Sequence, residues 1–161
     1  MNKTYTCCFT GHRHLPTDQM SKIKKQFDKA VDCLINQGFT YFISGGALGF
    51  DQLAAAWILD RKKQDQHIQL CLALPCRHQD AFWNAEQKNV YHHLIQNCDR
   101  FIYLADDYFD GCMKQRNHFI VDHACCCICA WLYPRSGTGQ TVRYAQKQGL
   151  KIFNVATDAI I

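Results

Sequence analysis

The chain has 161 residues, of which 48% are hydrophobic, and it carries a formal net charge of +4. This length suits one domain with a sizeable core, and this hydrophobic content argues against a disordered chain. There is no apolar run of 18 residues and no signal-peptide pattern at the start. We therefore expect a single domain over residues 1–161, without a membrane span, in the cytoplasm.

Hydrophobic periodicity divides the chain into alternating strands and helices. Short apolar runs predict six strands, at Thr6–Thr10, Phe39–Ile43, Ile68–Leu74, Phe101–Leu104, Cys125–Leu132 and Lys151–Val155. Apolar residues at three- and four-residue steps predict helices between Pro16 and Gly38 and at Phe50–Lys63, Glu86–Cys98, Cys112–Asp122 and Thr141–Gln148. Short connections force a parallel sheet with right-handed crossovers. The expected fold is α/β, a doubly wound and mainly parallel six-stranded sheet with helices on both faces.

The stretch from Thr40 to Asp51 combines a strand end, three glycines within five residues and a helix start. Glycine lets a backbone come close to a ligand, and the first N–H groups of a helix lack partners and carry partial positive charge. Such a unit favours a phosphate or carboxylate. A tight turn without a ligand stays open as the alternative, because the spacing matches neither strict glycine fingerprint. Asp51 either complements the helix dipole or binds a ligand.

Two further glycine-bearing segments follow predicted strands. In Gly11–Arg13, the planar fork of Arg13 suits phosphate, whereas His12 is a donor, a general acid–base or a plain hydrogen-bonding residue. Ser136–Thr141 is a glycine loop with hydroxyls that opens the helix expected from Thr141. Because all three segments follow parallel strands, they must emerge at one edge of the sheet, where ligands bind near the switch point.

The chain has eleven cysteines, most of them inside apolar runs. Cys126 and Cys129 form a Cys-x-x-Cys pair, but a redox pair normally opens a helix and a zinc site needs a second pair. This pair lies in a run that reads as a buried strand. We therefore interpret the cysteines as core residues and expect no metal.

Four segments carry a family resemblance. They are Phe9-Thr10-Gly11-His12-Arg13, Ser44-Gly45-Gly46-Ala47-Leu48-Gly49-Phe50-Asp51, Met113 with Arg116-Asn117, and Ser136-Gly137-Thr138-Gly139-Gln140-Thr141. Together they resemble the YpsA-like proteins of the SLOG superfamily, which also includes the DprA DNA-processing proteins and the LOG-type nucleoside-monophosphate phosphoribohydrolases. The resemblance covers nearly the whole chain. It implies a Rossmann-like fold and a pocket for a nucleotide or a nucleotide-derived, phosphoribosyl-containing ligand, but no known reaction.

On this resemblance we expect a ligand-binding module, such as a sensor, without a cofactor. Arg13 and Arg116 would neutralise the anion, the glycines and Thr138 would offer donors, and Asp51 would bond a ribose hydroxyl or stabilise its helix. The expected ligand-binding residues are Gly11, His12, Arg13, Ser44, Gly45, Gly46, Gly49, Asp51, Arg116, Asn117, Ser136, Gly137, Thr138 and Thr141.

Two other functions stay open. LOG-type enzymes carry Pro-Gly-Gly-x-Gly-Thr-x-x-Glu, and the glutamate is not found after the late loop here, so the candidates for cleaving an N-glycosidic bond are Asp51, His12 and Asp122. A DprA-like binder of single-stranded DNA needs a basic groove with stacking aromatics. The modest charge speaks against nucleic acid as a partner. A homo-oligomer is plausible by analogy with the superfamily.

Overall fold

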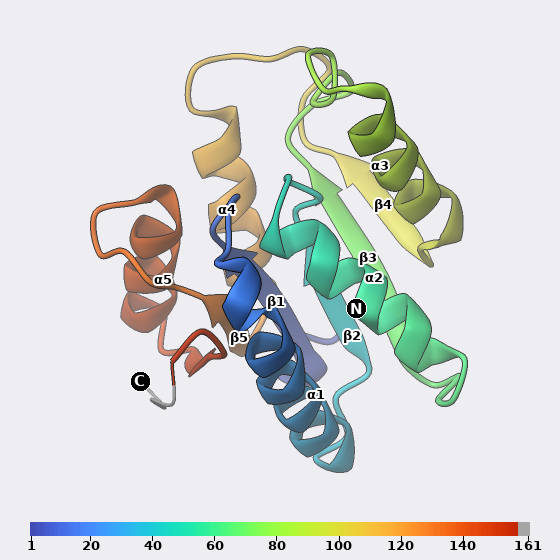
Figure 1. The fold of residues 1–161 in the computed structure, drawn as a ribbon, viewed down its shortest axis with the longest axis vertical. Helices are drawn as coiled ribbons and strands as arrows, with labels where there is room; N and C mark the ends of the chain where they lie inside the picture. Colours follow the sequence, from blue (N-terminus) through green and yellow to red (C-terminus); the bar gives the residue numbers. More distant parts are fainter. Residues whose placement is uncertain (158–161) are drawn as a thin grey trace.

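The six strands pair in parallel in the order β4-β3-β2-β1-β5-β6 in this computed structural model, which describes residues 1–157 (Figure 1). The strands are β1 (Thr6–Gly11), β2 (Tyr41–Ser44), β3 (Gln69–Leu74), β4 (Arg100–Tyr103), β5 (Cys126–Ala130) and β6 (Lys151–Asn154). The helices are α1 (Met20–Asn36), α2 (Phe50–Lys62), α3 (Ala85–Asn97), α4 (Cys112–Asp122) and α5 (Gly137–Lys147). The expected doubly wound α/β fold is confirmed.

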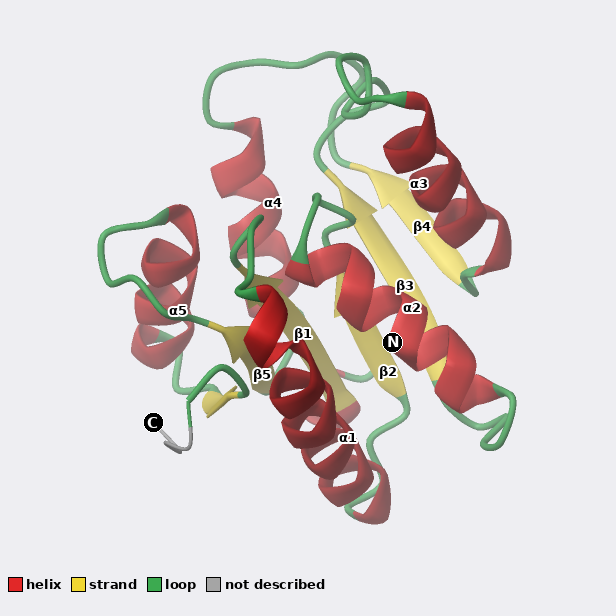
Figure 2. Ribbon diagram, in the orientation of Figure 1, coloured by secondary structure: helices red, strands yellow, loops and turns green. Residues whose placement is uncertain are grey.

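The helices cover the sheet in two layers (Figure 2). One apolar cluster joins the sheet to α1, α2 and α3, and its centre is aromatic: Phe9 packs against Phe27 and Phe42. The second cluster joins the other face to α4 and α5 through residues such as Ile120 and Val142. The central strands β1, β3 and β5 are buried almost throughout, and strands buried on both faces read as continuous apolar runs, which is why the sequence locates them well.

The strand order reverses between β1 and β5. From β1 the chain steps outward through β2 and β3 to β4, and α4 then carries it back to β5 on the other side of β1. The segments that follow β1 and β5 therefore lead away from one another at the carboxyl edge of the sheet, the edge at which the strands end. That divergence opens a crevice where doubly wound sheets bind ligands.

The start of α5 differs from the sequence expectation. The helix begins at Gly137 rather than at Thr141, because Ser136 caps it: the Ser136 hydroxyl oxygen accepts a hydrogen bond from the Gly139 amide at 3.0 Å. A serine N-cap outweighs the low helix propensity of two glycines. Gly137-Thr138-Gly139 is thus the first helical turn and not a loop.

The Cys126 and Cys129 thiols lie on opposite faces of β5. Cys126 belongs to the first apolar cluster and Cys129 to the second, as side-chain alternation along a strand requires. Burial raises the pKa of the Cys126 thiol to about 12 and raises that of Cys129 further. Protonated thiols on opposite faces cannot act together on a metal or a disulfide.

No helix within residues 1–157 is long and apolar enough to cross a membrane.

We expect Cys126→Ala and Cys129→Ala each to lower the free energy of unfolding by about 1 kcal/mol, because each leaves a methyl-sized cavity. The two losses should add in the double variant, since the sites face different clusters. Urea denaturation of the four proteins measures this. Stoichiometric zinc in the parent that disappears in the double variant would instead show a metal site.

Candidate functional site

A cavity of about 320 Å³ lies at the carboxyl edge of the sheet, beside the switch between β1 and β5. The three glycine-bearing segments and the start of α4 all contribute to it. We call it the switch-point cavity, and its lining residues are Thr10, Gly11, His12, Arg13, Ala47, Leu48, Asp51, Met113, Arg116, Asn117, Ser136, Gly137 and Thr138. The convergence inferred from strand order is thus present in the structure.

Asp51 and Arg116 form a buried ion pair at the base of this cavity. The Asp51 Oδ2 atom accepts a hydrogen bond from Arg116 Nη1 at 3.0 Å, and the two side chains are 7% and 4% exposed. Burial raises the pKa of the Asp51 carboxyl, while Arg116 and a hydrogen bond from the Ala47 backbone lower it. Because α2 and α4 lie on opposite faces of the sheet, the pair joins the two layers.

Gly45 leaves the space through which Arg116 reaches Asp51. A Cβ atom built on Gly45 would lie 1.2 Å from Arg116 Nη1. Gly49 has φ 91°, and a Cβ atom there would lie 2.4 Å from the Arg13 carbonyl oxygen. These glycines therefore let an arginine and a neighbouring loop come close, and neither of them lines the cavity itself.

Hydrogen bonds through the Ser44 hydroxyl also fix the loop after β2. The Gly46 amide donates to the Ser44 hydroxyl oxygen at 3.2 Å, and that hydroxyl donates to the Asp51 carbonyl oxygen at 2.7 Å. Ser44 and Gly46 were expected to contact ligand, but both are buried and neither lines the cavity, and the Ser44 hydroxyl instead holds the backbone of Asp51.

His12 connects the segments that follow β1 and β5. Its Nε2 atom accepts hydrogen bonds from the backbone amides of Leu132 at 2.9 Å and Tyr133 at 3.1 Å. Accepting both requires a neutral ring with its proton on Nδ1, and burial lowers the pKa of His12 accordingly. His12 lines the cavity, but its Nε2 is occupied in holding the cavity walls together.

Several donors facing the cavity have no partner. Within residues 1–157, the backbone amides of Gly137 and Thr138 and the side chain of Arg13 make no hydrogen bond. The two amides belong to the first turn of α5, where the helix dipole is positive. Together with the exposed Arg13 they give this side of the cavity positive charge and free N–H donors.

The remaining expected residues are more distant. Thr141 lies in the second turn of α5, where its Oγ1 atom accepts from Asn117 Nδ2 at 2.9 Å and donates to the Gly137 carbonyl oxygen at 3.0 Å. Asp122 lies at the last residue of α4, away from the cavity, and accepts from the Tyr144 hydroxyl at 2.8 Å. Sequence reasoning did not count Thr10, Ala47, Leu48 and Met113 as lining residues, although the first three stand beside or between the loop glycines.

Comparison with known proteins identifies the family. A family model described as the YspA SLOG family matches residues 7–157. The uncharacterized SPbeta prophage-derived protein YoqJ of Bacillus subtilis (strain 168) is 30% identical in an alignment 141 residues long, which covers 80% of this chain and 82% of that protein. The UPF0398 protein BH1768 of Halalkalibacterium halodurans is 27% identical over 101 residues, which are 62% of this chain and 53% of that protein.

Two solved structures share the fold. DNA processing protein A (DprA) from Streptococcus pneumoniae superposes with a TM-score of 0.66 at 17% identity, covering 94% of this chain and 50% of that one. DprA from Helicobacter pylori gives 0.65 at 18% identity, covering 95% of this chain and 65% of that one. This chain is therefore considerably shorter than either DprA protein.

The expectation that spoke against nucleic acid as a partner is wrong. The Helicobacter pylori structure is described as showing a single-stranded DNA binding mode, and it has the fold of this chain. The expectation used the net charge of +4, which is a sum over the whole chain. A DNA strand contacts only part of a protein surface. The local placement of cations such as Arg13 therefore matters more for DNA binding than the net charge of the whole chain.

We expect Arg116→Met to lower the free energy of unfolding at pH 7 by about 3–5 kcal/mol, because it leaves the Asp51 carboxylate buried without its cation. Without Arg116 the pKa of Asp51 rises further, so the folded variant binds a proton more readily than the unfolded chain. Its deficit relative to the parent should therefore shrink as pH falls towards 5. Urea denaturation at both pH values tests this.

Asp51→Asn combined with Arg116→Met is the control for that measurement. The double variant removes the unpaired charge, so it should be more stable than Arg116→Met at pH 7, and its deficit relative to the parent should not shrink as pH falls in the way that the deficit of Arg116→Met does. If both variants lose the same free energy of unfolding at both pH values, the Asp51 charge does not interact with Arg116 in the folded protein.

Proposed function

The chain belongs to the YspA SLOG family, and from this premise and the geometry of the switch-point cavity we propose that it binds a phosphate-bearing nucleotide. The ligand is a nucleotide or a nucleotide-derived, phosphoribosyl-containing small molecule. The observation that carries the proposal is the first turn of α5, whose Gly137 and Thr138 amides face the cavity unpartnered beside Arg13. A helix N-terminus with an adjacent arginine matches a phosphate in charge and geometry.

The rest of the cavity suits a nucleoside. Its volume of about 320 Å³ lies at the lower end of the range for small-molecule pockets, which is roughly 300–1,000 Å³. Ala47, Leu48 and Met113 supply apolar surface for a base, and the Asp51 carboxylate is an acceptor for a ribose hydroxyl. Because Arg116 is already paired with Asp51, Arg13 and the α5 amides carry the recognition of the phosphate.

The same phosphate chemistry has a second source. A phosphate within single-stranded DNA would meet the same amides and the same arginine, and the likeness to DprA supports including it. Thymidine 5′-monophosphate and a short oligothymidylate therefore serve as parallel probes. A polymer ligand gives an affinity that falls linearly with the logarithm of salt concentration, with a slope of about −0.7 per phosphate contacted.

We expect a bound nucleotide at about 100 times its dissociation constant to raise stability by roughly 2.7 kcal/mol. For a domain of this size, this corresponds to a melting shift of about 5–10 °C. Arg13→Ala should remove most of the shift without changing the unliganded melting temperature, because Arg13 is exposed and has no partner within the described residues. Differential scanning calorimetry with AMP, GMP, thymidine 5′-monophosphate and oligothymidylate measures it.

Lys29→Ala is the matched control, since it removes one exposed positive charge from α1, outside the cavity lining. It should leave the shift intact. If none of the probes shifts the parent at millimolar concentration, the binding proposal fails. If Arg13→Ala lowers the unliganded melting temperature, Arg13 is a structural residue.

We expect no release of free base from AMP, GMP, CMP or IMP at an enzymatic rate. Departure of the base develops positive charge on the ribose, and losing one electrostatic partner of that charge costs about 2.7–4 kcal/mol, or 10²–10³ in rate. Within residues 1–157, Asp51 is the only carboxylate that lines the cavity, and its charge is already paired with Arg116. Chromatography after long incubation tests this, and turnover that disappears in Asp51→Asn would identify a catalytic carboxylate.

A further inference from the structure

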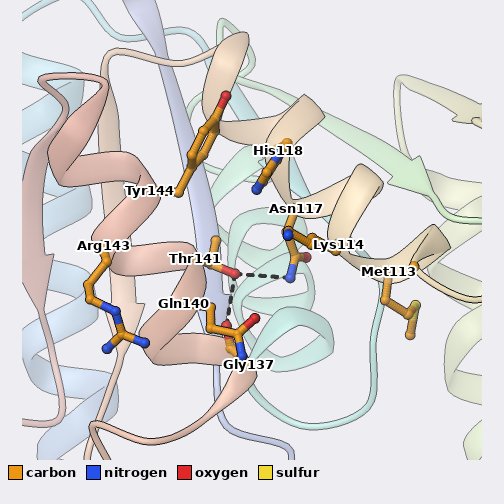
Figure 3. A pocket seen from close by; sticks show the side chains of 10 residues that line it. Met113, Lys114, Asn117, His118, Gly137, Gln140, Thr141, Arg143 and Tyr144 are labelled. Carbon is orange, nitrogen blue, oxygen red and sulfur yellow. Dashed lines mark hydrogen bonds between the residues drawn. The ribbon is translucent and has the colours of Figure 1, made fainter.

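A second hollow of about 580 Å³ lies between α4 and α5, next to the switch-point cavity (Figure 3). We call it the α4–α5 groove. Its lining residues are Gly111, Met113, Lys114, Asn117, His118, Gly137, Gln140, Thr141, Arg143 and Tyr144. Met113, Asn117 and Gly137 line both hollows, so the groove adjoins the cavity and extends from it between the two helices.

The charged side chains that line the groove are positive, and they make few interactions with the described part of the chain. Lys114 projects from α4 and Arg143 from α5, and both are exposed (Figure 3). Within residues 1–157, Lys114 has no hydrogen bond or ion pair, and Arg143 makes one hydrogen bond, from Nη1 to the Pro134 carbonyl oxygen at 3.0 Å. No carboxylate from the described part of the chain lines the groove; Asp122 accepts a hydrogen bond from the hydroxyl of the lining residue Tyr144.

The walls of the groove are fixed before any ligand arrives. The Asn117 side chain donates to the Thr141 hydroxyl oxygen at 2.9 Å, which ties α4 to α5. Further along the two helices, the His118 and Tyr144 rings stack with centroids 3.8 Å apart and an interplanar angle of 11°. Two contacts of this kind hold the helices at a set separation, so Lys114 and Arg143 border a preformed groove.

We propose that the α4–α5 groove is a subsite for a second phosphate of the ligand whose first phosphate meets the α5 N-terminus. The inference rests on the proposed function. Two cations that have no carboxylate partner within residues 1–157 and that line one preformed groove attract an anion. A mononucleotide phosphate at Gly137 and Thr138 leaves these cations unused, whereas a ligand with a second phosphate engages both sites. The ligand class is therefore a nucleoside bisphosphate or a phosphodiester-linked strand.

Three probes separate these sources: thymidine 5′-monophosphate, thymidine 3′,5′-bisphosphate and 5′-phosphorylated dithymidine. We expect the parent to bind at least one two-phosphate probe at least tenfold more tightly than the monophosphate in isothermal titration calorimetry at fixed salt. Lys114→Ala combined with Arg143→Ala should remove that advantage while changing monophosphate affinity by less than about threefold. Lys29→Ala, on α1, should change neither.

The outcomes separate this inference from the proposed function. If no probe binds the parent, both fail. If the monophosphate binds and neither two-phosphate probe gains, the subsite alone is overturned, as it is if the double variant weakens all probes equally. A gain with the bisphosphate identifies a small-molecule ligand, and a gain with dithymidine alone identifies a strand.

Discussion

The buried ion pair between Asp51 and Arg116 is the interaction on which the site depends. It runs from α2 on one face of the sheet to α4 on the other, at the base of the cavity. A buried pair of this kind contributes little net stability, because desolvation of both charges offsets their attraction. Its effect is to fix geometry: neither layer can shift at the carboxyl edge without leaving a charge buried and unpaired.

Much of the glycine motif follows from that constraint. Gly45 has no side chain because the Arg116 guanidinium lies against it, and Ser44 and the Ala47 amide hold the Asp51 end of the pair. The glycine-rich segment after β2 resembles a phosphate loop, but here Gly45 leaves room for the Arg116 guanidinium. The groups available to an anion lie across the cavity, in the first turn of α5 and on Arg13.

Charge at this edge is therefore divided between two tasks. Arg116 is neutralised by Asp51. Arg13 lines the switch-point cavity and Lys114 and Arg143 line the α4–α5 groove, and all three have N–H donors without a partner among the described residues. His12, a residue whose type invites a catalytic assignment, stays neutral because its Nε2 accepts two backbone amides. The positive rim and the buried ion pair beneath it are the features on which the proposed recognition of phosphates rests.

The sequence by itself determined the elements and their common edge. Continuous apolar runs locate β3 and β5, three- and four-residue spacing locates α1 and α2, and parallel strands send Gly11, Gly45 and Gly137 to the same side of the sheet. Only the tertiary structure decided which residues meet there. Arg116 reaches Asp51, 65 residues away, and His12 reaches Leu132, 120 residues away, because strand order brings β5 beside β1 and α4 packs against β1 and β3. Local periodicity records whether a side chain is buried, but a partner so distant in the chain is set by packing across the sheet.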